Sequence, residues 1–158
     1  MSEKYQIDSI DEQILEYLKA DARMPYTEIA KKLLLSGGTI HQRINKMTDA
    51  GIIKGSKLIV DYKKLGYDVT TLLGIYLQSA KDLTMVVERL QEMNEVVEVY
   101  YTTGSYALFI KTKTKTTEDY YQFLRNKLQT IPEIQSTESF ICLHQPVDRE
   151  ISLTELKY

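Results

Sequence analysis

The sequence contains few of the residues that build cross-linked, metal-bound or membrane-embedded proteins. Its 158 residues include one cysteine, two histidines and no tryptophan, and no hydrophobic run approaches the roughly 20 residues needed to span a bilayer. Cys142 has no second cysteine with which to form an internal disulfide, and with His41 and His144 it cannot complete a structural zinc site. The first residues lack the apolar stretch of a secretory signal. We therefore expect a cytoplasmic protein with no metal, no cofactor and no membrane partner.

Sequence motifs of the common enzyme classes are also missing. There is no glycine-rich phosphate loop, no G-x-S-x-G nucleophile turn and no pair of acids at a strand end. Cys142 lies within an apolar stretch, where a cysteine is more often a small core residue than a nucleophile. We therefore expect no catalytic residue.

The charge is unevenly divided along an otherwise ordinary globular composition. The chain is 43% hydrophobic and 27% charged, and its length allows one medium domain or two small ones. Residues 1–66 carry 11 basic and 9 acidic side chains, whereas residues 67–158 carry 9 and 13. The basic excess is concentrated between Pro25 and Gly66. This basic segment could contact the phosphates of a nucleic acid, or it could be the solvent-exposed face of a helix.

Two short helices are expected before residue 36. Ser9 followed by Glu12 has the spacing of a capping box, which predicts the first helix. Pro25 is expected to start the second helix. The apolar residues of the second helix at helical spacing predict its inner face, which comprises Ile29, Ala30, Leu33 and Leu34.

A third helix is expected from a cap at Ser36 to Ala50, closed by Gly51. Only one stripe of this helix is apolar, and its other side chains can contact bases or phosphates. Glycines in its first turn would either let a DNA backbone approach closely or merely loosen the turn. The segment 53–60 is predicted to be a small hairpin, or wing, whose lysines reach phosphates. The candidate DNA contacts are Ser36, Gly37, Gly38, Thr39, His41, Gln42, Arg43, Lys46, Lys54 and Lys57, with Thr39, His41 and Gln42 expected at bases.

The second half of the chain alternates between strand and helix patterns. The expected elements are a strand at 70–79, a helix at 82–93, strands at 96–103 and 107–112, a helix at 117–130 and a strand at 134–143. This order is that of the ferredoxin-like βαββαβ motif, so the fold class is α+β. The strands are apolar on both faces, yet two helices on one side cover only one face. We therefore expect a second copy of the chain to cover the other face.

Eight short motifs occur in an order that resembles the Lrp/AsnC family of transcription regulators. They all lie in the first 53 residues and include Ile7-Asp8, Ile14-Leu15, Leu35-Ser36 and Arg43-Ile44. The resemblance continues in the second half at the glycine turn Thr102-Thr103-Gly104-Ser105-Tyr106. The resemblance implies a winged helix-turn-helix DNA-binding domain at 1–60, a hinge at 61–66, a ferredoxin-like effector-sensing (RAM) domain at 67–145 and a C-terminal tail at 146–158.

The resemblance also implies a site for a small effector at this glycine turn. The positions carried over from the family are Tyr100, Thr102, Thr103, Gly104, Ser105, Tyr106 and Ala107, with Thr137 and Ser139 on the last strand. Family members usually have an aspartate just after this turn, but this chain has Ala107. Another acid such as Glu98 or Glu138 could replace it, the ligand could differ, or no ligand binds. The turn could also be a plain hairpin that needs a glycine with positive φ.

These patterns together predict a sequence-specific DNA-binding transcription regulator that responds to a small molecule, an amino acid or a related metabolite. The expected partners are double-stranded DNA, the effector and a second copy in a homodimer, which the family resemblance extends to assemblies as large as an octamer. One alternative is an enzyme similar to the siroheme decarboxylases, for which the second domain offers only His144, Arg89, Arg125 and Arg149 to hold a tetrapyrrole. The other is a small-molecule binder that does not act on DNA.

Overall fold

The computed structural model describes residues 5–153, which divide into two compact units. The first unit comprises residues 5–59 and 148–153, and the second comprises Val60–Val147. Within residues 5–153, no helix is both long and apolar enough to cross a bilayer.

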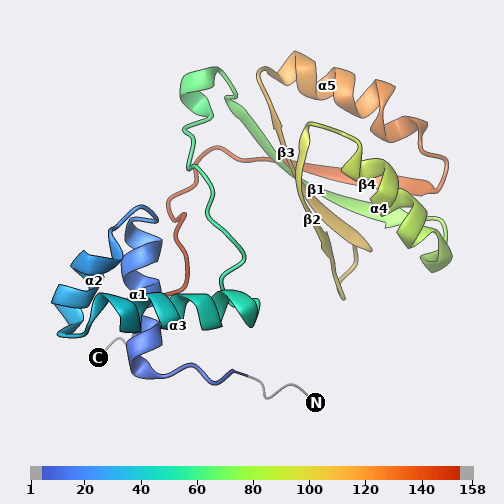
Figure 1. Ribbon diagram of the computed structural model, residues 1–158. Coiled ribbons are helices and arrows are strands. Elements are labelled where there is room, and N and C mark those ends of the chain that lie inside the picture. Colours follow the sequence, from blue (N-terminus) through green and yellow to red (C-terminus); the bar gives the residue numbers. More distant parts are fainter. Residues whose placement is uncertain (1–4, 154–158) are drawn as a thin grey trace. The chain divides into compact units, whose positions relative to one another are not determined.

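The first unit contains three helices, α1 (Ser9–Ala20), α2 (Tyr26–Leu33) and α3 (Gly37–Asp49) (Figure 1). The capping box of α1 lies one residue earlier than expected, because Asp8 and not Ser9 is the N-cap and Asp11 closes the box. The expected cap of α3 is confirmed, since the Ser36 side chain accepts a hydrogen bond from the Thr39 amide. Short polar caps of this kind satisfy amides that have no partner within the helix.

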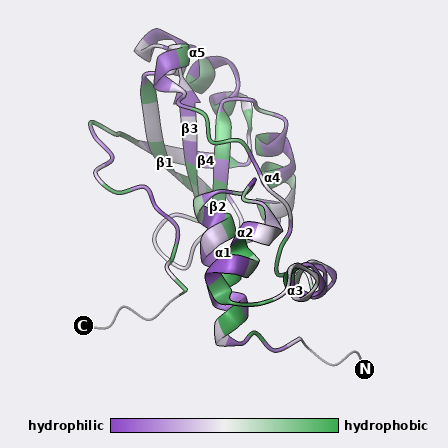
Figure 2. Ribbon diagram, turned by 60° about the vertical axis from the view of Figure 1, so that its left-hand side comes forward, coloured by the Kyte–Doolittle hydropathy of each residue, from purple (hydrophilic) through white to green (hydrophobic). Residues whose placement is uncertain are grey.

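The apolar faces of these helices form a small core. Ile14, Ile29, Ile40 and Met47 have no exposed surface. Figure 2 shows hydrophobic and hydrophilic residues alternating along α1, as expected for a helix with one buried face. The apolar stripe of α3 packs in this core, so the polar side chains of α3 face outward.

Leu34 was expected on the inner face of α2, and this prediction is wrong. Its backbone is left-handed (φ 56°, ψ 39°) and its side chain is 92% exposed. The left-handed residue ends the helix and redirects the chain, so that Leu35 packs against the core instead. The Leu35 amide bonds the Ala30 carbonyl (2.9 Å), which closes the turn between α2 and α3.

The expected hairpin at 53–60 is also wrong. No residue of this segment is paired in a strand within the described part of the chain. Leu58 and Ile59 are 80% and 89% exposed. A two-stranded hairpin is marginal in water unless it packs against other structure, and Leu58 and Ile59 belong to neither hydrophobic core of residues 5–153.

The second unit has the expected βαββαβ order. Its elements are β1 (Val69–Leu77), α4 (Leu83–Gln91), β2 (Val96–Tyr101), β3 (Leu108–Thr114), α5 (Thr117–Asn126) and β4 (Ile134–Ile141), with short 3-10 turns at Lys63–Leu65, Ala80–Asp82 and Leu128–Thr130. The strands form one antiparallel sheet in the order β2-β3-β1-β4. β1 lies between β3 and β4 and not next to β2, so the chain crosses over the sheet between β1 and β2, as expected of the split βαβ motif.

The helices α4 and α5 cover one face of this sheet (Figure 1). Leu73 and Ile75 of β1 and Leu108 and Ile110 of β3 point into the resulting core and have no exposed surface. Residues between them along each strand point to the opposite face, because side chains alternate across a strand.

That opposite face, here called the open face, carries a group of aromatic rings. The ring centroids of Tyr106 and Phe109 are 5.8 Å apart, and those of Phe109 and Phe140 are 6.4 Å apart. Tyr76 lies 5.0 Å from Tyr106. No helix of this unit packs on these rings within the described residues.

Candidate nucleic-acid interface and effector turn

The outward side of α3 carries most of the side chains expected at DNA. His41, Gln42 and Lys46 are exposed there, as is Ser36 at its cap. Thr39 is half-buried, with its hydroxyl oxygen 2.8 Å from that of Ser36. Exposed amide, imidazole and ammonium groups on one helical surface supply donors and acceptors for base edges and phosphates.

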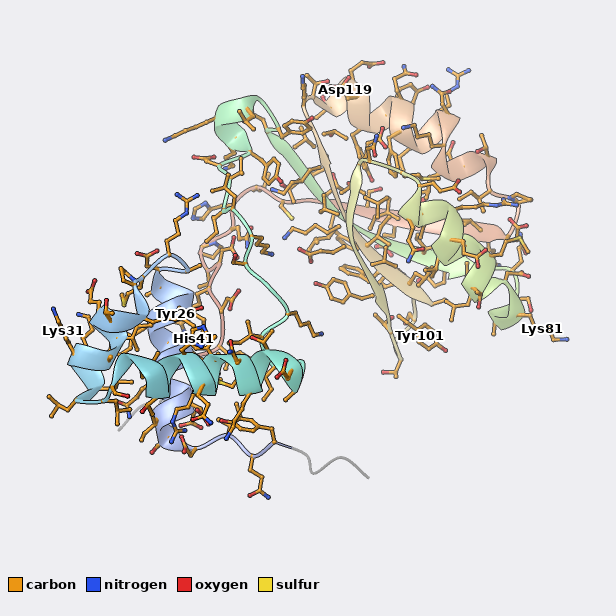
Figure 3. All side chains as sticks on the ribbon, viewed as in Figure 1. Tyr26, Lys31, His41, Lys81, Tyr101 and Asp119 are labelled. Carbon is orange, nitrogen blue, oxygen red and sulfur yellow. The ribbon has the colours of Figure 1, made fainter. Side chains whose placement is uncertain are left out.

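His41 is held in place by two neighbours. Its ring lies edge-on to that of Tyr26, with centroids 5.9 Å apart (Figure 3). The Asn45 side-chain amide lies 3.2 Å from His41 Nδ1. Tyr26 was not among the expected site residues, and its position directly after the Pro25 helix start is the only sequence signal that could have suggested it. The orientation of His41 is therefore set by both α2 and α3.

The glycines at the start of α3 are not required by the fold. A Cβ at Gly37 or Gly38 would meet its nearest atom at 3.9 Å, which is ordinary van der Waals contact. Neither residue has the positive φ that favours glycine. Each costs about 1 kcal/mol relative to alanine in a helix. Among the described residues, side-chain packing would therefore accept alanine at both positions.

Arg43 is engaged within the unit. Its Nη1 lies 2.8 Å from Asp8 Oδ2 and 2.8 Å from Asp11 Oδ1, and Asp11 is fully buried. Tyr5 donates its hydroxyl to the second Asp11 oxygen (2.9 Å). The Asp11 amide and the Arg43 guanidinium together lower the pKa of Asp8. The expected phosphate contact of Arg43 thus competes with a network that joins α3 to the start of α1.

Lys54 and Lys57 are exposed on the unpaired segment that follows α3. Their side chains have no ion-pair partner among the described residues. Both ammonium groups are free to contact a phosphate, although without the hairpin their positions are not fixed by strand pairing.

The glycine turn of the second unit borders a depression of about 240 Å³. Its lining residues come from the turn, from the ends of β1 and β2, and from the 3-10 turn and the first residue of α4. They are Leu77, Ala80, Leu83, Tyr101, Thr102, Gly104, Ser105 and Ala107. The expected residues Thr102, Gly104, Ser105 and Ala107 are therefore brought together, and the lining combines hydroxyl groups with apolar side chains. The other lining residues were not anticipated. Tyr101 is adjacent to the turn in sequence, whereas Leu77, Ala80 and Leu83 come from the βαβ crossover.

Gly104 does not have the conformation of a plain hairpin glycine. Its φ is not positive, so the interpretation of the turn as one requiring a left-handed glycine is wrong. A Cβ at this position would have no atom of the chain within 4 Å. The missing side chain leaves open space beside the depression.

The remaining effector candidates lie elsewhere. Thr103 is exposed at the turn without lining the depression. Ser139 is paired with Leu73 and its hydroxyl lies 2.7 Å from that of Tyr120, on the helix-covered side. Thr137, two residues earlier, points to the same side. None of these three residues lines the depression.

Two tyrosines near the turn are bonded to the acids that were considered as substitutes for the absent aspartate. Tyr100 donates to Glu98 and Tyr106 donates to Glu138, both at 2.5 Å. The Tyr100 hydroxyl, with Lys111, lowers the pKa of Glu98. Neither carboxylate lines the depression.

A short C-terminal segment belongs to the first unit. The Leu153 amide donates to Glu16 Oε1 (2.7 Å), and Lys19 Nζ donates to the Ile151 carbonyl. The Leu153 amide, with Lys19, lowers the pKa of Glu16. Residues 148–153 therefore pack on α1, and residues 154–158 of the expected C-terminal tail lie outside the described residues.

Comparison with known proteins matches the two parts of the chain to two family models. Residues 7–54 match the family model of the winged helix-turn-helix DNA-binding domain, and residues 70–151 match that of the Lrp/AsnC ligand binding domain. The chain is 50% identical over 147 residues to the regulatory protein AsnC of Haemophilus influenzae, which covers 93% of this chain and 98% of that protein.

Solved structures show the same fold. The structure of Escherichia coli AsnC superposes with a TM-score of 0.91 at 47% identity and covers 94% of this chain and 99% of that chain. A transcriptional regulator from Neisseria meningitidis, solved as a complex with L-Met, has a TM-score of 0.86 at 19% identity and covers 94% of this chain and 97% of that chain. The helix-turn-helix unit, the βαββαβ unit and these matches, which extend over nearly the whole length of the relatives, show that the chain belongs to the Lrp/AsnC family of transcriptional regulators.

Proposed function

We propose that this transcriptional regulator reads a specific DNA sequence with the exposed side of α3 and binds a small effector, an amino acid or related metabolite, beside the glycine turn. The chain acts as a homodimer in which the open faces of two copies meet. The enzymatic alternative is not favoured, because Arg89, one of its few candidate residues, is paired with Glu133 (3.0 Å).

The observation that carries the DNA-reading role is the pair of glycines at the start of α3. Since neither packing nor backbone conformation requires Gly37 or Gly38, their helical cost is explained by close approach of a ligand to this turn. The free amides of a helix start suit a phosphate, and the side chains that follow suit base edges. Gln42 and His41 are the base-reading residues in this proposal, while Lys46, Lys54 and Lys57 contact phosphates.

The experiment for DNA reading compares a base-contact variant with a matched control. Gln42→Ala should lose about 1–3 kcal/mol of discrimination at one base pair. Gln13→Ala makes the same change on α1, where the side chain is exposed and bonded to the Ser9 carbonyl, and should leave DNA binding unchanged. Fluorescence anisotropy with the DNA upstream of its own gene and with a random duplex measures both. Equal losses of Gln42→Ala on the two duplexes would refute base reading.

The effector role is supported by the open space at Gly104 and by Thr102 and Ser105, two hydroxyl-bearing residues that line the depression. No charged side chain of the described residues lines it. We infer that backbone amides of the turn bind the carboxylate of an amino-acid effector. Since this chain has Ala107 where family members usually have an aspartate, the ammonium group of the effector is not bound by an acid at that position. A thermal-shift screen of the proteinogenic L-amino acids tests this role, with Gly104→Leu as the variant that fills the space and abolishes any shift. A shift that survives this substitution would place the ligand elsewhere.

The homodimer is supported by the aromatic open face, since exposed apolar patches of this kind mark interaction surfaces. Light scattering after size exclusion at low micromolar concentration measures the mass. A stable monomer would refute the dimer, and a larger mass would extend it to the octamer.

A further inference from the structure

Tyr106 belongs at once to the effector turn and to the open face. Its flanking residues Ser105 and Ala107 line the depression, whereas its own side chain does not. The ring instead lies among the rings of Tyr76, Phe109 and Phe140. One residue thus contributes its backbone to one proposed site and its side chain to the other.

The backbone at Tyr106 is fixed by hydrogen bonds that close the turn. The Thr102 hydroxyl donates to the Tyr106 carbonyl (2.5 Å), and the Ala107 amide donates to the Ile75 carbonyl (3.0 Å). Since Thr102 lines the depression, a ligand that displaces its side chain also acts on the peptide unit of Tyr106.

The side chain of Tyr106 crosses β1 at a glycine. A Cβ added at Gly74 would lie 2.4 Å from Tyr106 Cδ1, a distance that real Cβ atoms do not tolerate. In the sheet, Gly74 is opposite Phe109 of β3 and Glu138 of β4. The Tyr106 hydroxyl reaches across β1 to bond Glu138 (2.5 Å). The ring is therefore seated on the sheet itself and fills a position that only a glycine leaves free.

We propose that Tyr106 is the residue that couples the effector turn to the dimer interface. This inference rests on the proposed function, because it takes the turn as the effector site and the open face as the contact between copies. A change in the turn shifts the ring on the open face, and a second copy packed on that face holds the ring and so orders the turn. By thermodynamic linkage this coupling is reciprocal. If dimerisation strengthens effector binding by some factor, effector binding strengthens dimerisation by the same factor.

The coupling is tested without knowledge of the effector, on the full chain. Sedimentation equilibrium gives the dimer dissociation constant, and hydrogen–deuterium exchange of the 102–107 segment is measured tenfold below and tenfold above that constant. In the unaltered protein, exchange of this segment should slow at least tenfold on dimerisation. In Tyr106→Ala, the dissociation constant should rise at least tenfold, and exchange of the turn should no longer respond to dimerisation at concentrations scaled to the new constant.

Two further variants keep the test independent of folding defects. Gly74→Ala should weaken the dimer through its clash with the ring, but in the Tyr106→Ala background the same substitution should have no further effect, because the ring is gone. Tyr121→Ala removes a half-exposed tyrosine of α5, on the helix-covered side, and should behave as the unaltered protein.

The possible outcomes distinguish failure of the proposed dimer from failure of the proposed coupling. An unaltered protein that stays monomeric overturns the proposed dimer and the coupling together. An unaltered protein that dimerises without any change in exchange of the turn overturns the coupling alone, and so do additive effects of Gly74→Ala and Tyr106→Ala. Loss of response in Tyr106→Ala with non-additivity at Gly74 supports it.

Discussion

Replacing Arg43 by methionine separates a structural role of this residue from a role at DNA. The substitution leaves Asp11 fully buried without its cationic partner, although Tyr5 and the Asp8 amide still donate to one of its oxygens. Breaking a buried ion pair from one side costs about 3–5 kcal/mol. Because the Arg43 side chain is 24% exposed and Asp11 keeps these other donors, we expect a loss of about 3 kcal/mol in the stability of the first unit.

Hydrogen exchange of α1 and α3 measures this loss directly in the full chain. A loss of about 3 kcal/mol corresponds to roughly a hundredfold faster exchange through opening of the unit. Asp11→Leu combined with Arg43→Met replaces the pair by apolar side chains, and it should recover about 2 kcal/mol relative to the sum of the single changes. The second unit, which contains neither residue, serves as the internal control.

The opposite result would assign Arg43 to the phosphate backbone. In that case Arg43→Met leaves exchange of α1 and α3 within threefold of the unaltered protein. It then weakens binding to all DNA sequences and lowers the salt slope by about one. This pair of results would refute the structural reasoning.

Three other predictions follow from single positions. Leu34→Gly should stabilise the first unit by about 0.5–1 kcal/mol, measured as slower exchange, because it relieves a left-handed backbone at an exposed side chain. Thr116→Ala should cost the second unit about 1 kcal/mol in a denaturant titration, because its side chain caps α5 in a capping box with Asp119; Thr117→Ala, just inside the helix, should be nearly neutral. The bond to Glu138 raises the pKa of Tyr106 from 10.0 to about 12, so its contribution to stability is complete below pH about 10 and is lost as the pH rises through about 12. An ultraviolet titration of tyrosinate should therefore lose one late-ionising group in Tyr106→Phe relative to the unaltered protein, and an unchanged curve in that variant would contradict the assignment.

The sequence predicts those parts of the fold that depend on local periodicity. The apolar spacing of Ile40, Ile44 and Met47 identifies the buried side of α3, and the alternation at Leu73 and Ile75 identifies the helix-covered face of the sheet. The errors arise where the local structure depends on one backbone conformation, as at Leu34, or on a packing partner that is absent, as for the expected hairpin at 53–60. Leu34 continues the helical pattern in sequence, yet its left-handed backbone ends the helix.

The candidate sites are predictable only in part, because their geometry depends on contacts between distant residues. Arg43 is 35 and 32 residues from Asp8 and Asp11, and no periodicity links them. The same holds for Tyr106 and Gly74, which meet only after β1 and β3 pair. The turn residues Thr102, Gly104, Ser105 and Ala107 could be grouped from sequence because they are neighbours along the chain. The lining contributed by Leu77 and Leu83 required the three-dimensional fold.

The segment 148–153 changes how the connectivity of this regulator is understood. The chain leaves the helix-turn-helix unit after residue 59, completes the whole βαββαβ unit and then returns to α1. In the order of the chain, the βαββαβ unit lies between two segments of the first compact unit. A chimera built by exchanging sensor units between relatives therefore needs two junctions. A fragment ended near residue 60 would lose the backbone partners of Glu16 and Lys19, and its stability would understate that of the same helices in the full chain.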